Sequence, residues 1–544
     1  MNSLHQETQK LGLRRAKHLL RRASFAYSAE ILNEFAELTP DKAFSKLIEK
    51  HEIEWSEPYD PLPKSNPDGN WTSSTKHPKL FDKQKKKKRI VTSWWWYNSI
   101  NKVSLKGKLT FFLHTSFTVA KDQGAAFSTH FYDHLRLLEY FSFGNLKTLA
   151  KKITFDNSML AYLDNTENNA TNPNENYARE FLELFTILKG SQKGNGDYTT
   201  FTEHDVQETA RVFSGVKTKL IRDTIDIDTN LPKGRILASK HATRDKVFSA
   251  AFNHYKISGK SNEEEIEKEL DEFVEMIFSK DATAISFCRK IYRYFVKSEW
   301  DDSVETDIIV PLSQKLKKDN YEIIPTLRKL LTSKHFYDSD DTNSTDEIVG
   351  SIIKSPLQLI SETISFFKLD IPHPMNEKMR FYKFFEFIHD SFLKAAGMPL
   401  WNPDSVAGYP AHYQEPDFDR HWFSSNTVLA RYKMIECLID GYDKIGKVKR
   451  IPTNLDLPNF VKENIKNPSN AIDLVTELSD FLYCEEIDDQ RKKYFAENLL
   501  EGFADFYWTN AWLQYEGSGN DTVVKTRLNA LITRMINAPE FQLM

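Results

Sequence analysis

Apolar residues recur at intervals of three and four along most of this chain, and this period constrains its fold more than any other feature. Residues 13–23, 42–53 and 90–103 each carry such a stripe. Because an α-helix turns once every 3.6 residues, this spacing lines one helix face with apolar side chains. Only 19 of 544 residues are Gly, and alternating β-branched runs are scarce. The pattern predicts a mainly α-helical globular protein, with at most a short β-hairpin near residues 217–228.

Chain length suggests how this helical protein is divided, because a single hydrophobic core stops growing at roughly 250–300 residues. A chain of 544 residues is therefore expected to form two or three helical subdomains. We place an N-terminal helical domain at 1–215, a middle helical subdomain at 216–345 and a C-terminal helical subdomain at 346–544. The C-terminal subdomain carries a loop at 399–422 that is rich in aromatic residues.

The balance of charges argues against a polyanionic partner. Lys and Arg total 73 against 77 Asp and Glu, which leaves a net charge of -4 spread along the chain. Nucleic acid is therefore not an expected ligand. The three Cys residues are an odd number at wide spacing, which suits neither a disulfide framework nor a four-thiolate metal site. We expect them to be buried free thiols.

Neither a membrane span nor a leader is evident in the printed sequence. A membrane-spanning helix needs about 18 or more consecutive apolar residues, and no such run occurs. Residues 1–20 also lack the apolar stretch of a signal peptide. As written, the chain is expected to have no membrane span and to be cytoplasmic. A mature form whose leader had been removed would instead be periplasmic or secreted.

One helix offers the clearest place for chemistry. Pro173 suits the turn before a helix, and Asn174 is expected to cap a helix that runs to residue 188. At 100° per residue, its polar face carries Asn176, Arg179, Glu180 and Glu183. If this face lines a cleft, burial raises the pKa of one carboxylate for acid chemistry, while Arg179 keeps the other ionised. If it faces water, pairs such as Glu175 with Arg179 support an exposed helix. Periodicity alone favours the exposed helix.

Histidines form a second group of candidates. His130 and His134 are four residues apart, which places both imidazoles on one helix face, where they could bind a metal with a carboxylate. The segment lacks the Glu that follows the first His in a zinc-peptidase motif, so packed or exposed histidines are the favoured interpretation. His114 lies in an apolar helical segment at 109–117 and is a further candidate for catalysis.

The candidate site residues fall into three sets, and the identity of any cofactor stays open. The catalytic candidates are Glu180, Glu183, Arg179 and His114. The substrate-binding candidates are Asn165, Asn174, Glu175, Asn176, Trp401 and Tyr409. The weak metal candidates are His130 and His134. The last two substrate-binding candidates lie in the loop 399–422, whose rings either stack on sugars or pack the loop onto the body. Packing is the favoured interpretation of the loop.

Several long strings support a family resemblance. They are LRRAKHLLRRASFAYS at 13–28, LDNTENNATNPNENYAREFLELFTILKG at 163–190, YTTFTEHDVQETARVFSG at 198–215 and WNPDSVAGYP at 401–410. With these strings in this order, the chain resembles, over nearly its whole length, the bacterial family catalogued as domain of unknown function 1800. The resemblance implies a name and a genomic context rather than a reaction.

That context leads to two hypotheses. Relatives are often encoded beside a sulfatase-like family, and many carry export signals. The candidate residues support a hydrolase-like or metal-assisted enzyme with a Glu/Arg/His site on core helices, and the genomic context suggests glycans or sulfated molecules as its substrates. That context equally allows a non-catalytic scaffold or maturation partner of a sulfatase-like protein, and we lean slightly towards the enzyme. Relatives often show His-Asn-His-Phe where this chain has His114-Thr115-Ser116-Phe117. A metal site built from paired histidines would be weakened here by Ser116.

Overall fold

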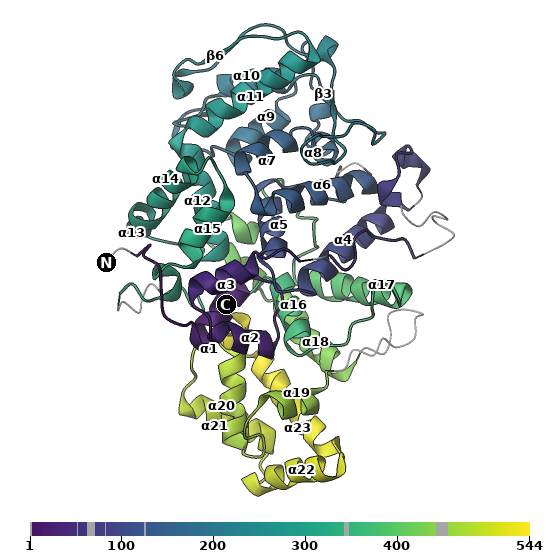
Figure 1. Ribbon diagram of the computed structural model, residues 1–544, viewed down its shortest axis with the longest axis vertical. Helices are drawn as coiled ribbons and strands as arrows, with labels where there is room; N and C mark the ends of the chain where they lie inside the picture. The colour runs from purple at the N-terminus through teal and green to yellow at the C-terminus, as the bar shows by residue number, and fades with distance from the viewer. Residues whose placement is uncertain are drawn as a thin grey trace.

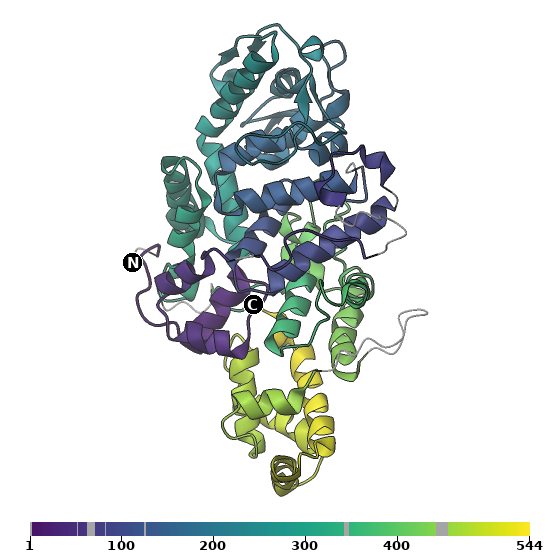
Figure 2. The same ribbon diagram turned by 45° about the vertical axis from the view of Figure 1, so that its right-hand side comes forward.

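The computed structural model describes residues 3–51, 53–61, 71–81, 83–124, 127–341, 347–441 and 455–544. Within these ranges the chain is mainly α-helical, which confirms the predicted class. Figure 1 shows three levels along the long axis: α7 to α11 at the top, α1 to α6 with α12 to α17 across the middle, and α19 to α23 at the bottom. The view turned by 45° keeps the same order (Figure 2).

The helices are bounded as follows. The first part of the chain forms α1 (Gly12–Ala23), α2 (Ala29–Ala36), α3 (Pro40–Leu47), α4 (Gln84–Ile100), α5 (Leu105–Ser116), α6 (Ser128–Tyr140), α7 (Leu146–Ile153), α8 (Asn157–Tyr162), α9 (Asn176–Glu180) and α10 (Glu203–Phe213). The middle part forms α11 (Glu263–Ser279), α12 (Asp281–Phe295), α13 (Asp302–Val304), α14 (Val310–Lys318) and α15 (Ile323–Leu331). The last part forms α16 (Pro356–Phe366), α17 (Lys378–Phe387), α18 (Thr427–Asp440), α19 (Leu457–Asn464), α20 (Ala471–Leu482), α21 (Asp489–Leu500), α22 (Asp505–Ser518), α23 (Thr522–Asn537) and α24 (Pro539–Gln542).

The β-structure of the described residues consists of three two-stranded antiparallel sheets. They pair β1 (Gln192–Gly194) with β2 (Asp197–Tyr198), β3 (Val216–Lys217) with β4 (Arg235–Ile236), and β5 (Lys246–Val247) with β6 (Lys256–Ile257). The predicted hairpin near 217–228 is present only at its start, because the partner strand lies beyond residue 228. The alternating apolar residues that suggested this hairpin do not form a buried strand face. Leu220, Ile225 and Ile227 are exposed, the last at 95%.

Local sequence signals explain where the helices near the site begin. Thr202 caps α10, with its side chain accepting from the Asp205 backbone N–H and the Asp205 side chain accepting from the Thr202 backbone N–H. This reciprocal arrangement satisfies two backbone donors that a helix start would otherwise leave unpaired. Ser355 caps α16 by accepting from the backbone N–H of Gln358, and Pro356 follows in the first turn. Both starts follow ordinary helix-capping chemistry.

One continuous cluster of buried hydrophobic residues extends from Leu4 to Phe541 and includes residues from all three predicted subdomains. The first and last parts of the chain are in direct contact, because Arg21 of α1 donates to the carbonyl oxygen of Leu482 at 2.7 Å. Figure 1 shows α1 and α2 directly above α20 and α21. The boundaries at 215 and 345 therefore stay a prediction about folding units rather than a description of separate cores.

A buried ion cluster joins α1 to α16. The Glu362 carboxylate accepts from Arg21 Nε at 2.8 Å, Lys354 Nζ at 3.0 Å and the Tyr27 hydroxyl at 3.0 Å. All four side chains are buried. Burial alone would raise the pKa of Glu362, but Arg21 and Lys354 outweigh that effect and lower it to about 2. The Glu362 carboxylate is therefore ionised at neutral pH.

The cysteines and the helices also bear on the sequence predictions. Cys288 and Cys484 are buried, Cys437 is half-buried, and all three are free thiols, as predicted. Among the helices that the structure describes, none is both long enough and apolar enough to cross a membrane.

Candidate functional site

The predicted polar helix is irregular. Asn174 Oδ1 accepts from the backbone N–H of Asn176 at 2.9 Å, but the cap position of α9 is Glu175, so the predicted cap by Asn174 is displaced by one residue. The α-helix α9 ends at Glu180, and one π-helical turn, η5 (Phe181–Phe185), follows it. The prediction of one regular α-helix to residue 188 is therefore wrong. Thr186 causes the change, because its backbone N–H and its hydroxyl both donate to the Phe181 carbonyl, at 3.0 and 2.6 Å. Such π-turns occur often at functional sites.

Arg179 lies at the centre of a network of carboxylates. Its Nη1 and Nη2 donate to the two carboxylate oxygens of Glu203, at 2.8 and 2.5 Å. Nη2 also donates to Glu175 at 3.1 Å, which is the predicted pair four residues apart. The Glu183 carboxylate lies 3.8 Å from Nη1. The bonds to Glu203 raise the pKa of Arg179 further. Arg179 is thus bonded to carboxylates of the chain itself, so to bind a substrate anion it would have to exchange one of them.

Glu180 and Glu183 experience different surroundings. Glu183 is 11% exposed and forms an ion pair with Lys189 at 2.7 Å. Glu180 is half-buried and accepts no hydrogen bond from any described side chain. Burial, and the neighbouring charge of Glu183, raise the pKa of Glu180 to about 7. One carboxylate is therefore paired with a cation, while its neighbour titrates near neutral pH.

The polar face of this helix is partly exposed to solvent. The side chain of Arg179 is 32% exposed, and that of Glu175 34%. Glu180 and Glu183 lie deeper, beside the buried aromatic residues of the same helix. A solvent-borne substrate could reach such a face, while the carboxylates keep a partly desolvated environment.

The amides among the substrate-binding candidates bond mainly to backbone groups. Asn165 is buried, and its Nδ2 donates to the carbonyls of Phe213 and Val216, both at 3.3 Å. Asn176 Nδ2 donates to the carbonyl of Leu163 at 3.2 Å. These bonds tie the loop before α9 to α10 and β3. In this structure Asn165 is enclosed by the fold, whereas Asn176 remains exposed.

His114 belongs to a different cluster. Its ring is fully buried and lies 4.6 Å from Trp401 and 6.3 Å from His134, measured between ring centroids. Neither ring nitrogen of His114 has a hydrogen-bond partner among the described residues. Burial first, and then the neighbouring His134 and Lys121, lower its pKa well below the usual range. The structure therefore brings His114 together with Trp401 and does not join it to the Arg179 network.

The aromatic loop packs onto the body, as the favoured interpretation predicted. Trp401 is fully buried against Trp95, and Tyr409 stacks on Phe111 at 6.1 Å. The Tyr409 hydroxyl donates to the Pro399 carbonyl at 2.7 Å. Because both rings face inward, this conformation presents neither Trp401 nor Tyr409 as an open surface for stacking sugars.

The metal candidates do not converge on a full set of ligands. His134 Nδ1 lies 2.9 Å from Asp156 Oδ2, and His130 Nε2 lies 3.4 Å from the Leu220 carbonyl. Both rings are fully buried. Within the part of the chain that the structure describes, no group of three or more His, Cys, Asp or Glu side chains is arranged to hold a metal ion. Protein metal sites usually need at least three such donors.

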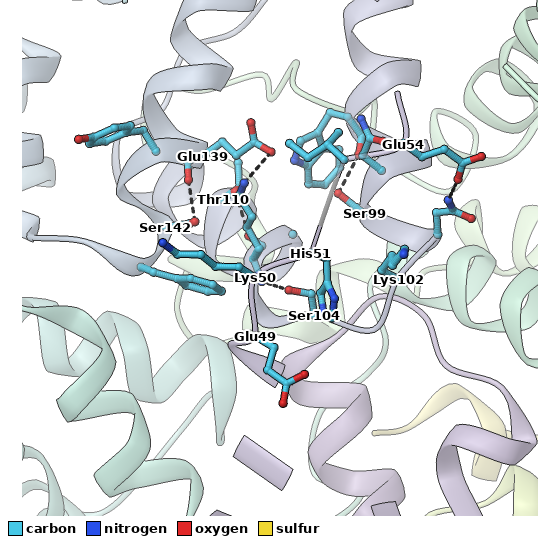
Figure 3. Close-up of a pocket in the computed structure, with 18 of the residues that line it drawn as sticks. Glu49, Lys50, His51, Glu54, Ser99, Lys102, Ser104, Thr110, Glu139 and Ser142 are labelled. Carbon is cyan, nitrogen blue, oxygen red and sulfur yellow. Dashed lines mark hydrogen bonds and ion pairs between the residues drawn. The ribbon is translucent and has the colours of Figure 1, made fainter. Parts of the chain in front are cut away.

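A further cavity of about 420 Å³, whose lining includes none of the candidate residues, lies between the chain that follows α3, helices α4 and α5, and the end of α6. Figure 3 shows its lining, with Glu139, Thr110 and Ser99 along one side and Lys50, His51 and Lys102 along the other. Trp94 and Trp95 contribute to its apolar part. Its size falls within the usual range for small-molecule sites.

Comparison with known proteins identifies the family. The family described as "Protein of unknown function (DUF1800)" matches residues 18–543. The chain belongs to the DUF1800 family. No curated protein and no solved structure matches it. The DUF1800 match spans the Arg179 network, the His114 cluster and the cavity alike, so membership does not favour one of them over the others.

Sequence reasoning missed two features of this DUF1800 chain. It did not identify Glu203 as the main partner of Arg179, because 24 residues separate them and the turn through β1 and β2 brings them together. One signal was available. Glu203 directly follows the Thr202 cap, so it lies at a helix start, where it can pair with a basic residue of the segment packed against that start. The cavity of Figure 3 had no comparable signal, because its lining comes from four separate segments without a common motif.

Proposed function

We propose that this DUF1800 protein is a hydrolase-like enzyme that uses Glu180 as its general acid and Glu183 as its general base. One observation carries the proposal: two carboxylates three residues apart have opposite environments. Glu183 is paired with Lys189, whereas Glu180 is half-buried without a partner among the described side chains. Pairs of carboxylates with separated pKa values are the usual basis of acid–base hydrolysis.

The proposed reaction assigns a role to each group. Glu180 donates its proton to the oxygen of the leaving group, while Glu183 accepts a proton from the attacking water molecule. Arg179 contacts Glu183 at 3.8 Å and bonds to Glu203, so it acts as a positioning residue for the Glu183 carboxylate. Two carboxylates in these roles hydrolyse glycosidic bonds in many enzymes.

For the substrate class we propose a glycan or a sulfated molecule, on the basis of the genomic context that the family resemblance implies. The acid–base version has more support than a metal-assisted one, because no third donor joins His130 and His134 among the described residues. His114 has no part in the proposed step, since it contacts Trp401 and His134 instead of the carboxylates.

The test is a hydrolysis screen with chromogenic aryl glycosides and aryl sulfates. Turnover of any of them should fall at least a hundredfold in Glu180→Gln and in Glu183→Gln, since positioned acid–base groups contribute roughly 10²–10⁴ in rate. Glu175→Gln is the matched control, because Glu175 lies on the same face and bonds to the same arginine. An activity that survives both active-site substitutions would refute the assignment.

A second function, as a non-catalytic scaffold or maturation partner of a sulfatase-like protein, has one observation in its favour. Helix α22 exposes several large apolar side chains. Phe506 is 57% exposed, Tyr507 53% and Leu513 54%. Adjacent exposed rings of this kind are typical of protein-binding surfaces. Figure 1 shows α22 at the lower end of the molecule, away from α9.

The two functions can be separated by co-purification. If the chain is a scaffold, a sulfatase-like protein encoded nearby should co-purify with it. The complex should survive Glu180→Gln and be lost in the double variant Phe506→Ser/Tyr507→Ser. Loss of turnover in Glu180→Gln, with no partner retained by either protein, would support the enzyme instead.

A further inference from the structure

The cavity of Figure 3 is built by a close crossing of two helices. A Cβ atom placed on Gly107 of α5 would lie 3.0 Å from the Cβ and Oγ atoms of Ser99 on α4. A larger residue at position 107 would have to push the Ser99 side chain aside, so Gly107 favours this close approach of the two helices. The crossing brings the start of α5 against the end of α4, and the cavity of about 420 Å³ opens beside it.

The interior of the cavity is mainly apolar. Trp94 and Trp95 of α4 line it, with Tyr140 and Phe143 from the end of α6. Trp94 and Trp95 are 1% and 3% exposed, so their rings are fixed by the core behind them. Tyr140, at 53% exposed, lies at the mouth. A rigid apolar wall of this kind favours the apolar part of a ligand.

Two of the three carboxylates that line the cavity are already paired. Glu139 lies 3.2 Å from Lys106 and 3.6 Å from Arg136. Glu54 forms an ion pair with His373 at 2.7 Å and accepts a hydrogen bond from Asn101. These bonds hold the pKa of Glu54 below its usual value, so it stays ionised and bonded. Neither carboxylate therefore needs a cationic ligand.

The third carboxylate, Glu49, is exposed, and Figure 3 shows it pointing away from the other labelled side chains.

The cations at the mouth show the opposite situation. Lys50 and Lys102 are both exposed and form no ion pair with any described residue. His51 lies between them in Figure 3 and adds a positive charge when it is protonated. Of the three lysines that line the cavity, Lys106 is paired with Glu139, so Lys50 and Lys102 are the two that a negative group of a ligand can pair with. The charge pattern of the mouth thus complements a negative group.

We propose that this cavity binds a small amphiphilic anion. Its apolar body would lie against Trp94 and Trp95, and its carboxylate, sulfate or phosphate group would bind between Lys50 and Lys102. The ligand class is a medium-chain carboxylic acid or an aromatic acid of similar size. The site is separate from Glu180 and does not depend on the function proposed above.

Isothermal titration calorimetry of the full chain with decanoate tests the proposal, with decyltrimethylammonium as a probe of equal chain length and opposite charge. Both are used below the concentrations at which they form micelles. Decanoate should bind saturably at one site, more tightly than the cation. The double variant Lys50→Glu/Lys102→Glu should weaken decanoate binding at least tenfold. Affinity should also fall as salt is raised, because exposed charges are screened.

The matched control is Lys493→Glu, an exposed lysine on α21 outside the cavity, which should bind decanoate as the unchanged chain does. Both mutated lysines are on the surface, so the double variant is expected to fold, and its melting temperature verifies this. Three results would overturn the proposal: no saturable binding of decanoate, tighter binding of the cation, or unchanged decanoate affinity in the double variant.

Discussion

The two terminal nitrogens of Arg179 donate hydrogen bonds to the two carboxylate oxygens of Glu203, and this pair links α9 to α10 across the short β1–β2 turn. Two parallel bonds of this kind are among the strongest that a surface carboxylate makes. Glu203 is also held at its backbone, since its N–H donates to Asp197 Oδ1 at 2.9 Å. The position of Arg179, and through it that of Glu183, is therefore set by α10.

Substitution of Glu203 tests this link. Glu203→Gln should lower the free energy of unfolding by about 1 kcal/mol, a modest loss because the pair is partly exposed. Glu175→Gln, which removes only one bond to the same arginine, should cost less. Urea denaturation at pH 7 measures both. A larger cost for Glu175→Gln would mean that the bidentate pair is not the main contact.

The carboxylate of Glu180 should make stability depend on pH. Its pKa is raised from 4.5 to about 7, so the folded state binds its proton more tightly than the unfolded state. Stability is then lost as the pH rises from about 4.5 to about 7. Glu180→Gln removes that loss. The free energy of unfolding of the variant minus that of the unchanged chain should be about 1 kcal/mol larger at pH 8 than at pH 4.5. This figure is reduced for the partial exposure of the group.

Denaturation curves of both proteins at pH 4.5 and pH 8 measure this difference, and the comparison at pH 4.5 serves as the internal control. If the variant instead loses stability at pH 8 relative to pH 4.5, the folded protein stabilises the Glu180 carboxylate, which contradicts the prediction.

The buried cluster around Glu362 predicts a larger effect. Glu362→Gln leaves Arg21 and Lys354 buried without a counter-charge and should cost about 3–5 kcal/mol. The matched control is Glu34→Gln, which removes an exposed ion pair to Lys46 and should cost less than about 1 kcal/mol. Thermal unfolding of the three proteins measures both losses. Equal costs would mean that the cluster is hydrated in solution.

The features of the fold that depend on local patterns could be predicted from the sequence. The helical class follows from apolar spacing, and a cap such as that of Thr202 with Asp205 involves only four neighbouring residues. The turn at η5 was not predictable in the same way. Phe181–Phe185 has ordinary helical spacing, and the change of period comes from the Thr186 hydroxyl, whose rotamer the sequence does not determine.

The candidate site shows the same division. The pair of Glu175 with Arg179 was predicted, since both lie one turn apart on one helix. The proximity of His114 to Arg179 was expected and is not found, because the contacts of His114 depend on how the loop 399–422 packs over α5. The packing of Trp401 follows from tertiary contacts between segments nearly 300 residues apart, for which spacing within one helix holds no information.

Buried neutral histidines should make the protein sensitive to acid. Burial lowers the pKa of His412 from 6.5 to about 4, aided by Lys108 and Arg293. The unfolded state therefore binds a proton that the folded state does not between about pH 6.5 and pH 4, and stability falls as the pH decreases through that window. The loss of stability between pH 6.5 and pH 4 should be smaller in His412→Gln than in the unchanged chain, by at most about 3 kcal/mol, since each pKa unit corresponds to about 1.4 kcal/mol. Denaturation at pH 7 and pH 4.5 measures it.

The control for His412 must disturb the same packing without changing a group that titrates in this range. Tyr409→Phe meets this need, because Tyr409 lies 6.5 Å from His412 between ring centroids and burial raises its pKa above the usual value. Its loss of stability should be equal at both pH values, since neither tyrosine nor phenylalanine takes up a proton there. If His412→Gln retains the full acid-dependent loss, the proton uptake belongs to other buried histidines, of which His130, with a pKa lowered to about 4, is the next to substitute.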